Sequence, residues 1–162
     1  VIGAGAEKVV IGAAAADDPS FIRLASATFG ASTIVVCMDV KRSWLGGRKV
    51  WTRNGTSPTR HTPESFARLM EEMGAGELIV QSIDNDGMMD GYDIQLIQDV
   101  SKAVSIPVIC LGGAGNLQHM ERARSEGFAS ALAAGSMFVY HGPHKGVLIN
   151  YPERSEVPFR LS

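Results

Sequence analysis

The chain has 162 residues, of which 45% are hydrophobic and 20% charged, a composition typical of a globular protein with its own core. The formal net charge of −2 gives no electrostatic reason to expect nucleic acid or an anionic membrane as a partner. The longest apolar runs fall far short of the roughly 18 residues needed to cross a bilayer, which excludes a membrane span from the printed sequence.

Five apolar runs predict strands, at residues 8–12, 33–40, 77–83, 107–113 and 130–138. The runs do not alternate polar with apolar residues, so they predict strands buried on both faces, as in a parallel sheet. Cys37 and Cys110 lie inside these runs, and two lone buried thiols favour a reducing, cytoplasmic location without disulfides.

Amphipathic segments between the runs predict helices, at residues 17–30, 62–76, 92–105 and 116–128. The first two begin with an N-cap candidate followed by proline, Asp18-Pro19 and Thr62-Pro63. A Gly-Gly pair predicts a small hairpin inserted near 43–55.

The resulting alternation of strands and helices predicts one α/β domain over residues 1–162. Two architectures fit: an open doubly wound sheet, or part of a (βα)8 barrel. The barrel would be incomplete, because eight strand–helix units need about 200–250 residues. The chain begins with Val1 in a stretch that reads like the end of a helix, so we expect a piece of a longer protein.

Acids and glycines stand at the carboxyl ends of the predicted strands, where both architectures place their chemistry. Glycine lets a phosphate approach the backbone, and two such turns at neighbouring strand ends predict a phosphate cradle, although each turn alone also fits a purely structural role. The phosphate-binding candidates from this pattern are Gly12, Gly87, Gly112, Gly113, Gly135 and Ser136.

Asp39 ends the second predicted strand and is a candidate general acid or base. The alternative is a structural acid paired with Lys41 or Arg42. At the opposite ends of the strands, Lys8 and Glu77 form either a local salt bridge or a charged gate.

The acidic stretch SIDNDGMMDGYD at 82–93 does not fit a calcium loop. Met88 occupies the third ligand position counted from Asp84, and Gln95 stands where the bidentate glutamate belongs. We therefore expect no metal and an active-site carboxylate in this loop, where Asp84 and Asp86 both follow the strand. His141 and His144 are interpreted as part of a surface turn.

Five segments together resemble the cyclase subunit of imidazole glycerol phosphate synthase: GAEKVVIGAAA, IVVCMDVKR, GAGELIVQSIDNDGMMDGYD, IPVICLGGAGN and ALAAGSMF. The resemblance implies a (βα)8 barrel, of which this chain carries strands four to eight as a truncated, partial barrel. It also implies a lyase/cyclase without cofactor, which joins ammonia from a glutaminase subunit to a phosphorylated ribulosyl-aminoimidazole substrate in histidine biosynthesis.

The resemblance also assigns roles to residues. Asp39 matches a catalytic aspartate whose first-strand partner has no match here, so we expect the isolated chain to be inactive; Asp86 matches a secondary acid. Lys8 and Glu77 match charges that gate ammonia, and Glu7 matches a position facing the glutaminase. The positions that match a phosphate site are Gly87, Gly113, Ala134 and Gly135.

Two departures keep other functions open. Gly12 stands where the family usually has asparagine, and Leu111 where it usually has serine. The tail from 135 onwards looks more like paralogues that use ammonia to amidinate a surface-polysaccharide sugar. A further alternative is a non-catalytic partial barrel that binds phosphate and a partner protein, and whose exposed edges favour self-association.

Overall fold

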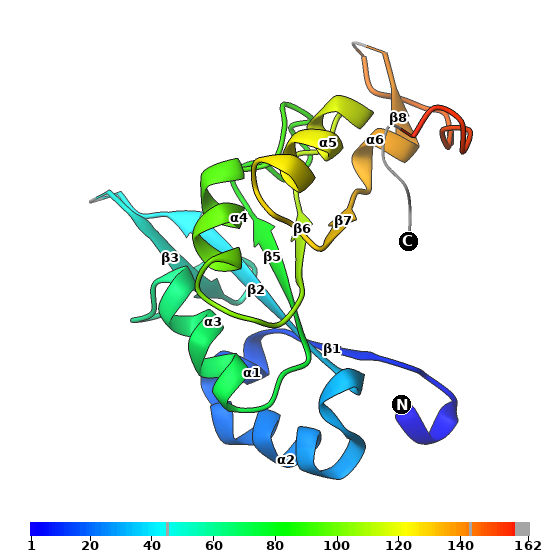
Figure 1. Cartoon of the computed structure of the whole chain (residues 1–162). Helices are drawn as coiled ribbons and strands as arrows, with labels where there is room; N and C mark the ends of the chain where they lie inside the picture. The colour runs from blue at the N-terminus through cyan, green and yellow to red at the C-terminus, as the bar shows by residue number, and fades with distance from the viewer. Residues whose placement is uncertain (45, 143, 158–162) are drawn as a thin grey trace.

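The computed structural model describes residues 1–44, 46–142 and 144–157 (Figure 1). The strands are β1 (Val9–Ile11), β2 (Ile34–Arg42), β3 (Arg48–Thr52), β4 (Ser57–Pro58), β5 (Glu77–Ser82), β6 (Val108–Leu111), β7 (Ala131–Ala133), β8 (Tyr140–His141) and β9 (Gly146–Val147). The α-helices are α1 (Ala13–Asp17), α2 (Pro19–Phe29), α3 (Pro63–Glu72), α4 (Ile94–Ser101), α5 (Leu117–Ser125) and α6 (Ser136–Val139), and short 3₁₀ turns span Ile2–Ala4 and Ala31–Thr33.

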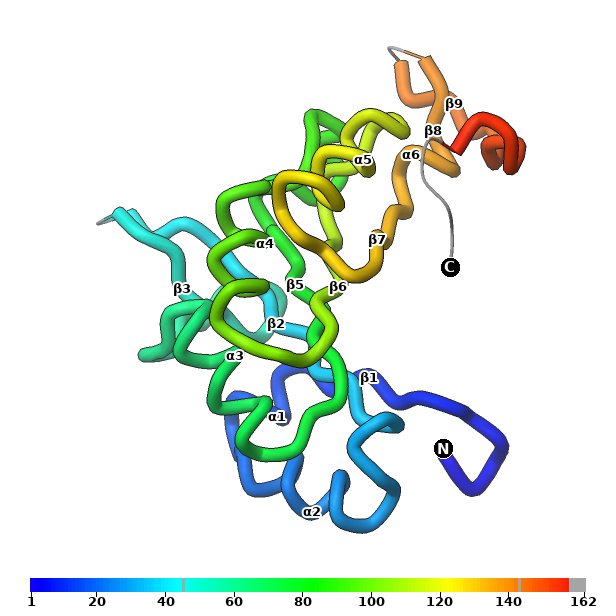
Figure 2. Tube along the Cα trace, in the orientation of Figure 1, coloured from blue at the N-terminus to red at the C-terminus, as the bar shows by residue number. Residues whose placement is uncertain are grey.

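Parallel strands follow one another in space in the order β1, β2, β5, β6, β7, which is also their order in the chain. Helices α1 to α5 lie on one side of this sheet (Figures 1 and 2). A doubly wound sheet would reverse its strand order and carry helices on both faces. The arrangement is therefore that of consecutive strands in a (βα)8 barrel, which confirms the predicted class and the partial barrel of five parallel strands.

An antiparallel hairpin extends the sheet beyond its parallel part. β1 pairs with the first residues of β2, and β3 pairs with the last ones, from Asp39 opposite Trp51 to Arg42 opposite Arg48. The turn between β2 and β3 contains Gly46 and Gly47, both with positive φ. Residue Leu45, inside the predicted hairpin, lies outside the described residues.

The helix starts follow from local sequence. The carboxylate of Asp18 accepts from the Ser20 N–H at 3.0 Å, and the Thr62 hydroxyl accepts from the Ser65 N–H at 3.3 Å, as the predicted caps require. One predicted strand is wrong beyond its first half. β7 ends at Ala133, and the residues from Ser136 turn into α6, because Gly135 leaves the extended conformation at φ −121°, ψ −66°.

The core lies between the sheet and the helices, and most of the fully buried strand residues face it. In β5 burial alternates: Leu78, Val80 and Ser82 are buried, and Glu77, Ile79 and Gln81 are half-buried. The prediction of strands buried on both faces is therefore wrong for most of the concave face, with the buried Val35 of β2 as an exception. Helices cover the convex face alone, and five strands do not enclose the interior that a closed barrel fills with side chains.

Within the described residues, no helix is long and apolar enough to span a lipid bilayer.

Candidate active site at the carboxyl ends of the strands

Two acids meet at the carboxyl ends of β2 and β5. Asp39 alternates with the buried Met38 and Val40, so it faces the concave side of the sheet. Gln81 lies opposite Asp39 in the pairing of β2 with β5, and its side-chain amide donates to Asp86 Oδ2 at 3.3 Å. Gln81 thus bonds to Asp86 and is the register neighbour of Asp39 in the sheet.

Burial raises the pKa of the half-buried Asp39 above that of an ordinary aspartate, and the negative charge of Asp86 raises it further. The same surroundings act on Cys37, which precedes Asp39 on the same face. Burial, with a smaller contribution from the charge of Asp39, raises the pKa of this thiol to about 11. A carboxyl that holds its proton more tightly is better suited to act as a general acid than an ordinary aspartate.

The structural alternative for Asp39 required Lys41 or Arg42 as partner. The Lys41 ammonium instead lies over the Trp51 ring, 5.3 Å from its centroid. The Arg42 guanidinium lies 3.8 Å from Asp93 Oδ2, and its backbone N–H donates to Asp84 Oδ2 at 2.9 Å. Both predicted partners of Asp39 are therefore engaged elsewhere.

A small pocket lies beside these acids, at the ends of β5, β6 and β7. Its lining residues are Asp86, Gly87, Leu111, Gly112, Gly113, Ala134, Gly135 and Ser136. All predicted phosphate-binding residues except Gly12 line this pocket, which we call the glycine pocket. Gly12 caps α1 at the end of β1, two strands away from β5, and is not part of it.

The glycines of the pocket are required for different reasons. A Cβ atom on Gly113 would lie 2.2 Å from the carbonyl oxygen of Gly91, and Gly113 has φ +107°. The Gly91 N–H also donates to the Gly113 carbonyl at 2.8 Å, so this glycine serves backbone packing. At Gly135, neither positive φ nor a nearby atom within 4 Å demands glycine. Its missing side chain leaves space at the pocket instead.

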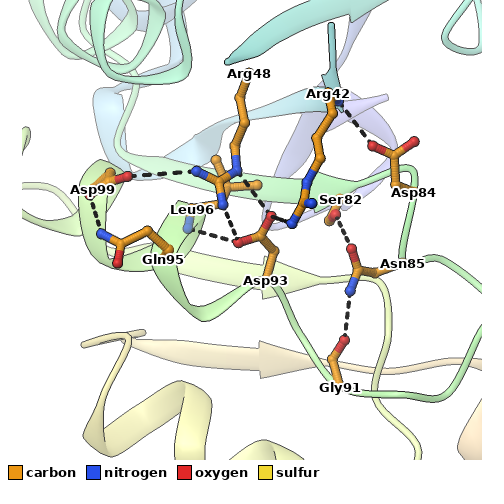
Figure 3. Close-up of polar contacts among 10 residues, drawn as sticks. All are labelled: Arg42, Arg48, Ser82, Asp84, Asn85, Gly91, Asp93, Gln95, Leu96 and Asp99. Carbon is orange, nitrogen blue, oxygen red and sulfur yellow. Dashed lines mark hydrogen bonds and ion pairs between the residues drawn. The ribbon is translucent and has the colours of Figure 1, made fainter. Parts of the chain in front are cut away.

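The loop that contains Asp86 is held by its own polar groups, and Figure 3 shows those of Ser82, Asn85 and Gly91. The Ser82 hydroxyl donates to Asn85 Oδ1 at 2.9 Å, and Asn85 Nδ2 donates to the Gly91 carbonyl at 3.0 Å. The Tyr92 hydroxyl then donates to the Ala133 carbonyl at 2.9 Å, which ties the loop to the end of β7. These bonds hold the loop after β5 against the end of β7 at the glycine pocket.

Asp93 anchors the far end of this loop to the β2–β3 hairpin (Figure 3). Arg48 Nη2 donates to Asp93 Oδ1 at 2.7 Å and Arg48 Nε donates to Asp93 Oδ2 at 3.0 Å, a two-bond pair. Asp93 Oδ1 also accepts from the Leu96 N–H at 3.1 Å and so caps α4. The Asp93 side chain is only 8% exposed, which marks it as a structural acid.

The other end of the strands carries a second charged pair. Lys8 Nζ and Glu77 Oε1 form an ion pair at the amino end of the sheet, with side chains 48% and 21% exposed. The neighbouring Glu7 is exposed. The pair itself fits both predictions made for it, the local salt bridge and the charged gate.

Metal ligands do not gather in the part of the chain that the structure describes: no three His, Cys, Asp or Glu side chains are placed to hold an ion. His141 and His144 are exposed in the β8–β9 hairpin, and Pro143 between them lies outside the described residues.

Sequence reasoning missed Gln81, Tyr92 and the Arg48 partner of Asp93. Gln81 left a signal, since it is a polar residue directly after the apolar run Leu78–Val80 and on the same face as Ile79. The other two act through contacts between segments far apart in the sequence, and nothing in the local pattern indicates them.

Comparison with known proteins agrees with this geometry. Residues 1–145 match the family model described as "Histidine biosynthesis protein". The chain belongs to this family. It is 40% identical, over 92% of its length, to the putative imidazole glycerol phosphate synthase subunit hisF2 of Pseudomonas aeruginosa.

Two further relatives are putative imidazole glycerol phosphate synthase subunits HisF, from Leptospira borgpetersenii and Leptospira interrogans. They are 39% and 37% identical over 96% of this chain. The resemblance predicted from the sequence is confirmed. The chain spans about 60% of the length of these relatives, since the aligned part covers 59% of the first and 62% of the others.

Proposed function

We propose that the chain forms the phosphate-binding, acid–base part of an ammonia-using synthase subunit of the imidazole glycerol phosphate synthase type. One observation carries the proposal: Asp39, with its raised pKa, and Asp86 lie beside a glycine pocket at one mouth. The printed names of the relatives support the same reaction class.

The chemistry divides between the pocket and Asp39. A phosphate of the substrate would enter the glycine pocket, where no side chain at Gly135 obstructs it and backbone N–H groups can donate to its oxygens. That anchor fixes the rest of the substrate over the concave face, where Asp39 exchanges protons with the reacting atoms. The resemblance implies a second catalytic aspartate, which no residue of this chain matches.

Ammonia would enter from the amino end of the strands. The Lys8–Glu77 pair lies there, at the foot of β1 and β5, and is partly exposed, so its side chains have room to separate and close again. The exposed Glu7 lies beside this entrance on the face that we expect a glutaminase subunit to cover.

A chimera tests the proposal, because the chain spans only part of its relatives. In it, this chain replaces the matching part of the Pseudomonas aeruginosa relative, and ammonium chloride replaces the glutaminase. We expect ammonium-dependent turnover of the phosphorylated ribulosyl-aminoimidazole substrate, and a loss of about 100-fold or more in kcat for Asp39→Asn. Substrate affinity should stay within about threefold, since Asp39 acts on the reacting atoms and not on the phosphate.

Two results would contradict this. Turnover that survives Asp39→Asn removes Asp39 from the acid–base role. A chimera that folds and binds phosphate but never turns over the substrate removes the histidine-pathway reaction while leaving the phosphate site in place.

The second candidate is the amidination of an acetamido sugar with the same ammonia chemistry. The observation that favours it is the apolar Leu111 in the wall of the glycine pocket, where a serine would offer a hydrogen bond. The same chimera, given an acetamido-sugar acceptor in place of the histidine-pathway substrate, separates the two. The amidine product indicates the paralogous reaction.

The third candidate is a non-catalytic subunit that binds phosphate and associates through its open face. Val10 at the β1 edge is 55% exposed, and Ile79 and Ile109 are half-buried on the concave side. We expect the 162-residue chain to self-associate through this face in analytical ultracentrifugation. A well-folded monomer at tens of micromolar would contradict that expectation.

A further inference from the structure

The glycine pocket poses an electrostatic problem that its lining does not solve. Asp86 is the charged residue among the residues that line it, and Asp39 stands nearby. A phosphate dianion placed beside these carboxylates is repelled, because like charges at such separations oppose each other by kilocalories in a protein environment. A cation close to the pocket would offset this repulsion.

Lys145 is placed to be that cation. Its ammonium donates to the carbonyl oxygen of Gly87 at 2.9 Å, and Gly87 lines the pocket. An ammonium has three N–H donors, and this contact uses one of them. The other two remain for oxygens of a bound anion.

The hairpin that carries Lys145 begins at the pocket. Gly135 and Ser136 lead into α6, which continues directly into β8, and β9 follows after the turn that contains Lys145. Figure 1 shows this hairpin beyond the carboxyl end of β7, near α5 and α6. The segment that leaves the pocket at Gly135 therefore brings the Lys145 side chain back to it.

The backbone at Lys145 adds a second observation. It has φ +49°, in the left-handed region, and its N–H donates to the Gly142 carbonyl at 3.1 Å to close the turn. Glycine or asparagine is favoured in this conformation, and a lysine there is uncommon. The turn thus presents a long cationic side chain at a position whose backbone does not favour one.

We infer that Lys145 is a binding residue of the glycine pocket, which holds the phosphoryl group of the substrate between the Lys145 ammonium and the backbone at Gly113 and Gly135. The inference rests on the proposed phosphate site and adds to it the cation that balances Asp86. It also assigns the β8–β9 hairpin a role as the outer wall of the site.

The test is a titration of the chain with inorganic phosphate, followed by the ¹H–¹⁵N shifts of Gly113, Gly135 and Ser136. Lys145→Met removes the charge and the donor. Lys145→Gln removes the charge but keeps an N–H donor for the Gly87 carbonyl, so it separates electrostatics from hairpin anchoring. Lys145→Arg keeps the charge.

We expect Lys145→Met and Lys145→Gln to weaken phosphate binding about tenfold, and Lys145→Arg to stay within about threefold of the original chain. The matched control is Lys102→Met, which removes one positive charge at the far end of α4, where Lys102 lies over the Phe128 ring. It should bind phosphate as the original chain does. Added sodium chloride should weaken binding more in the original chain than in Lys145→Gln.

Three outcomes overturn the inference. Unchanged affinity in Lys145→Gln would make Lys145 a structural anchor only. An equal loss in Lys102→Met would show a general charge effect. If the original chain itself produces no shifts at the pocket, the proposed phosphate site fails together with the inference, whereas the first two outcomes leave that site standing.

Discussion

Acidic residues on the two sides of the loop between β5 and α4 lie in opposite electrostatic environments. On the outer side, Asp93 forms two bonds with Arg48 and caps α4 while almost fully buried. On the inner side, Asp86 is exposed, accepts from the neutral Gln81 amide, and raises the pKa of Asp39 by repulsion. Asp93, which holds the fold, is neutralised by Arg48, whereas the charge of Asp86 acts against ionisation of Asp39, which suits the proposed proton transfer at Asp39.

The largest change in stability is expected for Asp93, on the outer side of the loop. Asp93→Ala should lower the free energy of unfolding by about 3 kcal/mol, because it removes a helix cap and leaves a half-buried Arg48 without its closest partner. Urea unfolding followed by circular dichroism measures this. Asp93→Asn keeps the cap and should lose about half as much.

Asp90 provides the control for this prediction, since it is an exposed acid in the same loop. Asp90→Ala should change the free energy of unfolding by less than about 0.5 kcal/mol. Equal effects at Asp90 and Asp93 would remove the distinction between the two sides of the loop.

The same distinction shows what the sequence could predict. Asp39 and the glycine turns follow apolar runs, and because parallel strands end at one edge, position along the chain was enough to gather them. Asp18 and Thr62 were predicted as caps from their place before an apolar run, whereas Asp93 was not among the predicted caps, although it stands in a similar place. Arg48 was not recognisable as its partner, because that contact depends on how the β2–β3 hairpin lies over the loop.

Two predictions from apolar runs were wrong, each for a physical reason. The run SALAAGSMF is apolar throughout, so its pattern alone does not separate the strand β7 from the helix α6 that follows. The apolar β strands were expected to be buried on both faces, since the pattern records the environment of a closed barrel. Five strands leave the concave face half-buried.

A smaller effect is expected on the inner side of the loop, where Asp86 acts on the pKa of Asp39. Asp86→Asn should lower the pKa of Asp39, because it removes the repulsion that discourages ionisation, while burial continues to hold the pKa above the ordinary value. The ¹³C shift of the Asp39 carboxyl, titrated against pH, measures it. Asp90→Asn should leave that titration unchanged, and an unchanged pKa in Asp86→Asn would show that the two acids do not interact.

The raised pKa has a consequence for stability. Between the ordinary aspartate pKa and the higher value of folded Asp39, the folded chain holds more protons than the unfolded chain. The contribution of Asp39 to the free energy of unfolding is therefore fully present below that pH window, and it is lost as the pH rises through the window. Asp39→Asn should abolish this part of the pH dependence, as urea unfolding across the window can show.

The smallest effect belongs to the charged pair at the foot of the strands. Lys8 and Glu77 are paired like Asp93 and Arg48, yet their side chains are 48% and 21% exposed, so solvent screens their attraction. A double-mutant cycle with Lys8→Met and Glu77→Gln should give a coupling of about 1 kcal/mol or less, falling further at high salt. A coupling comparable to that of Asp93 and Arg48 would make the pair part of the structural frame and argue against its opening. A weak, salt-sensitive coupling instead describes a pair that separates readily, which is the property that the proposed ammonia entrance requires.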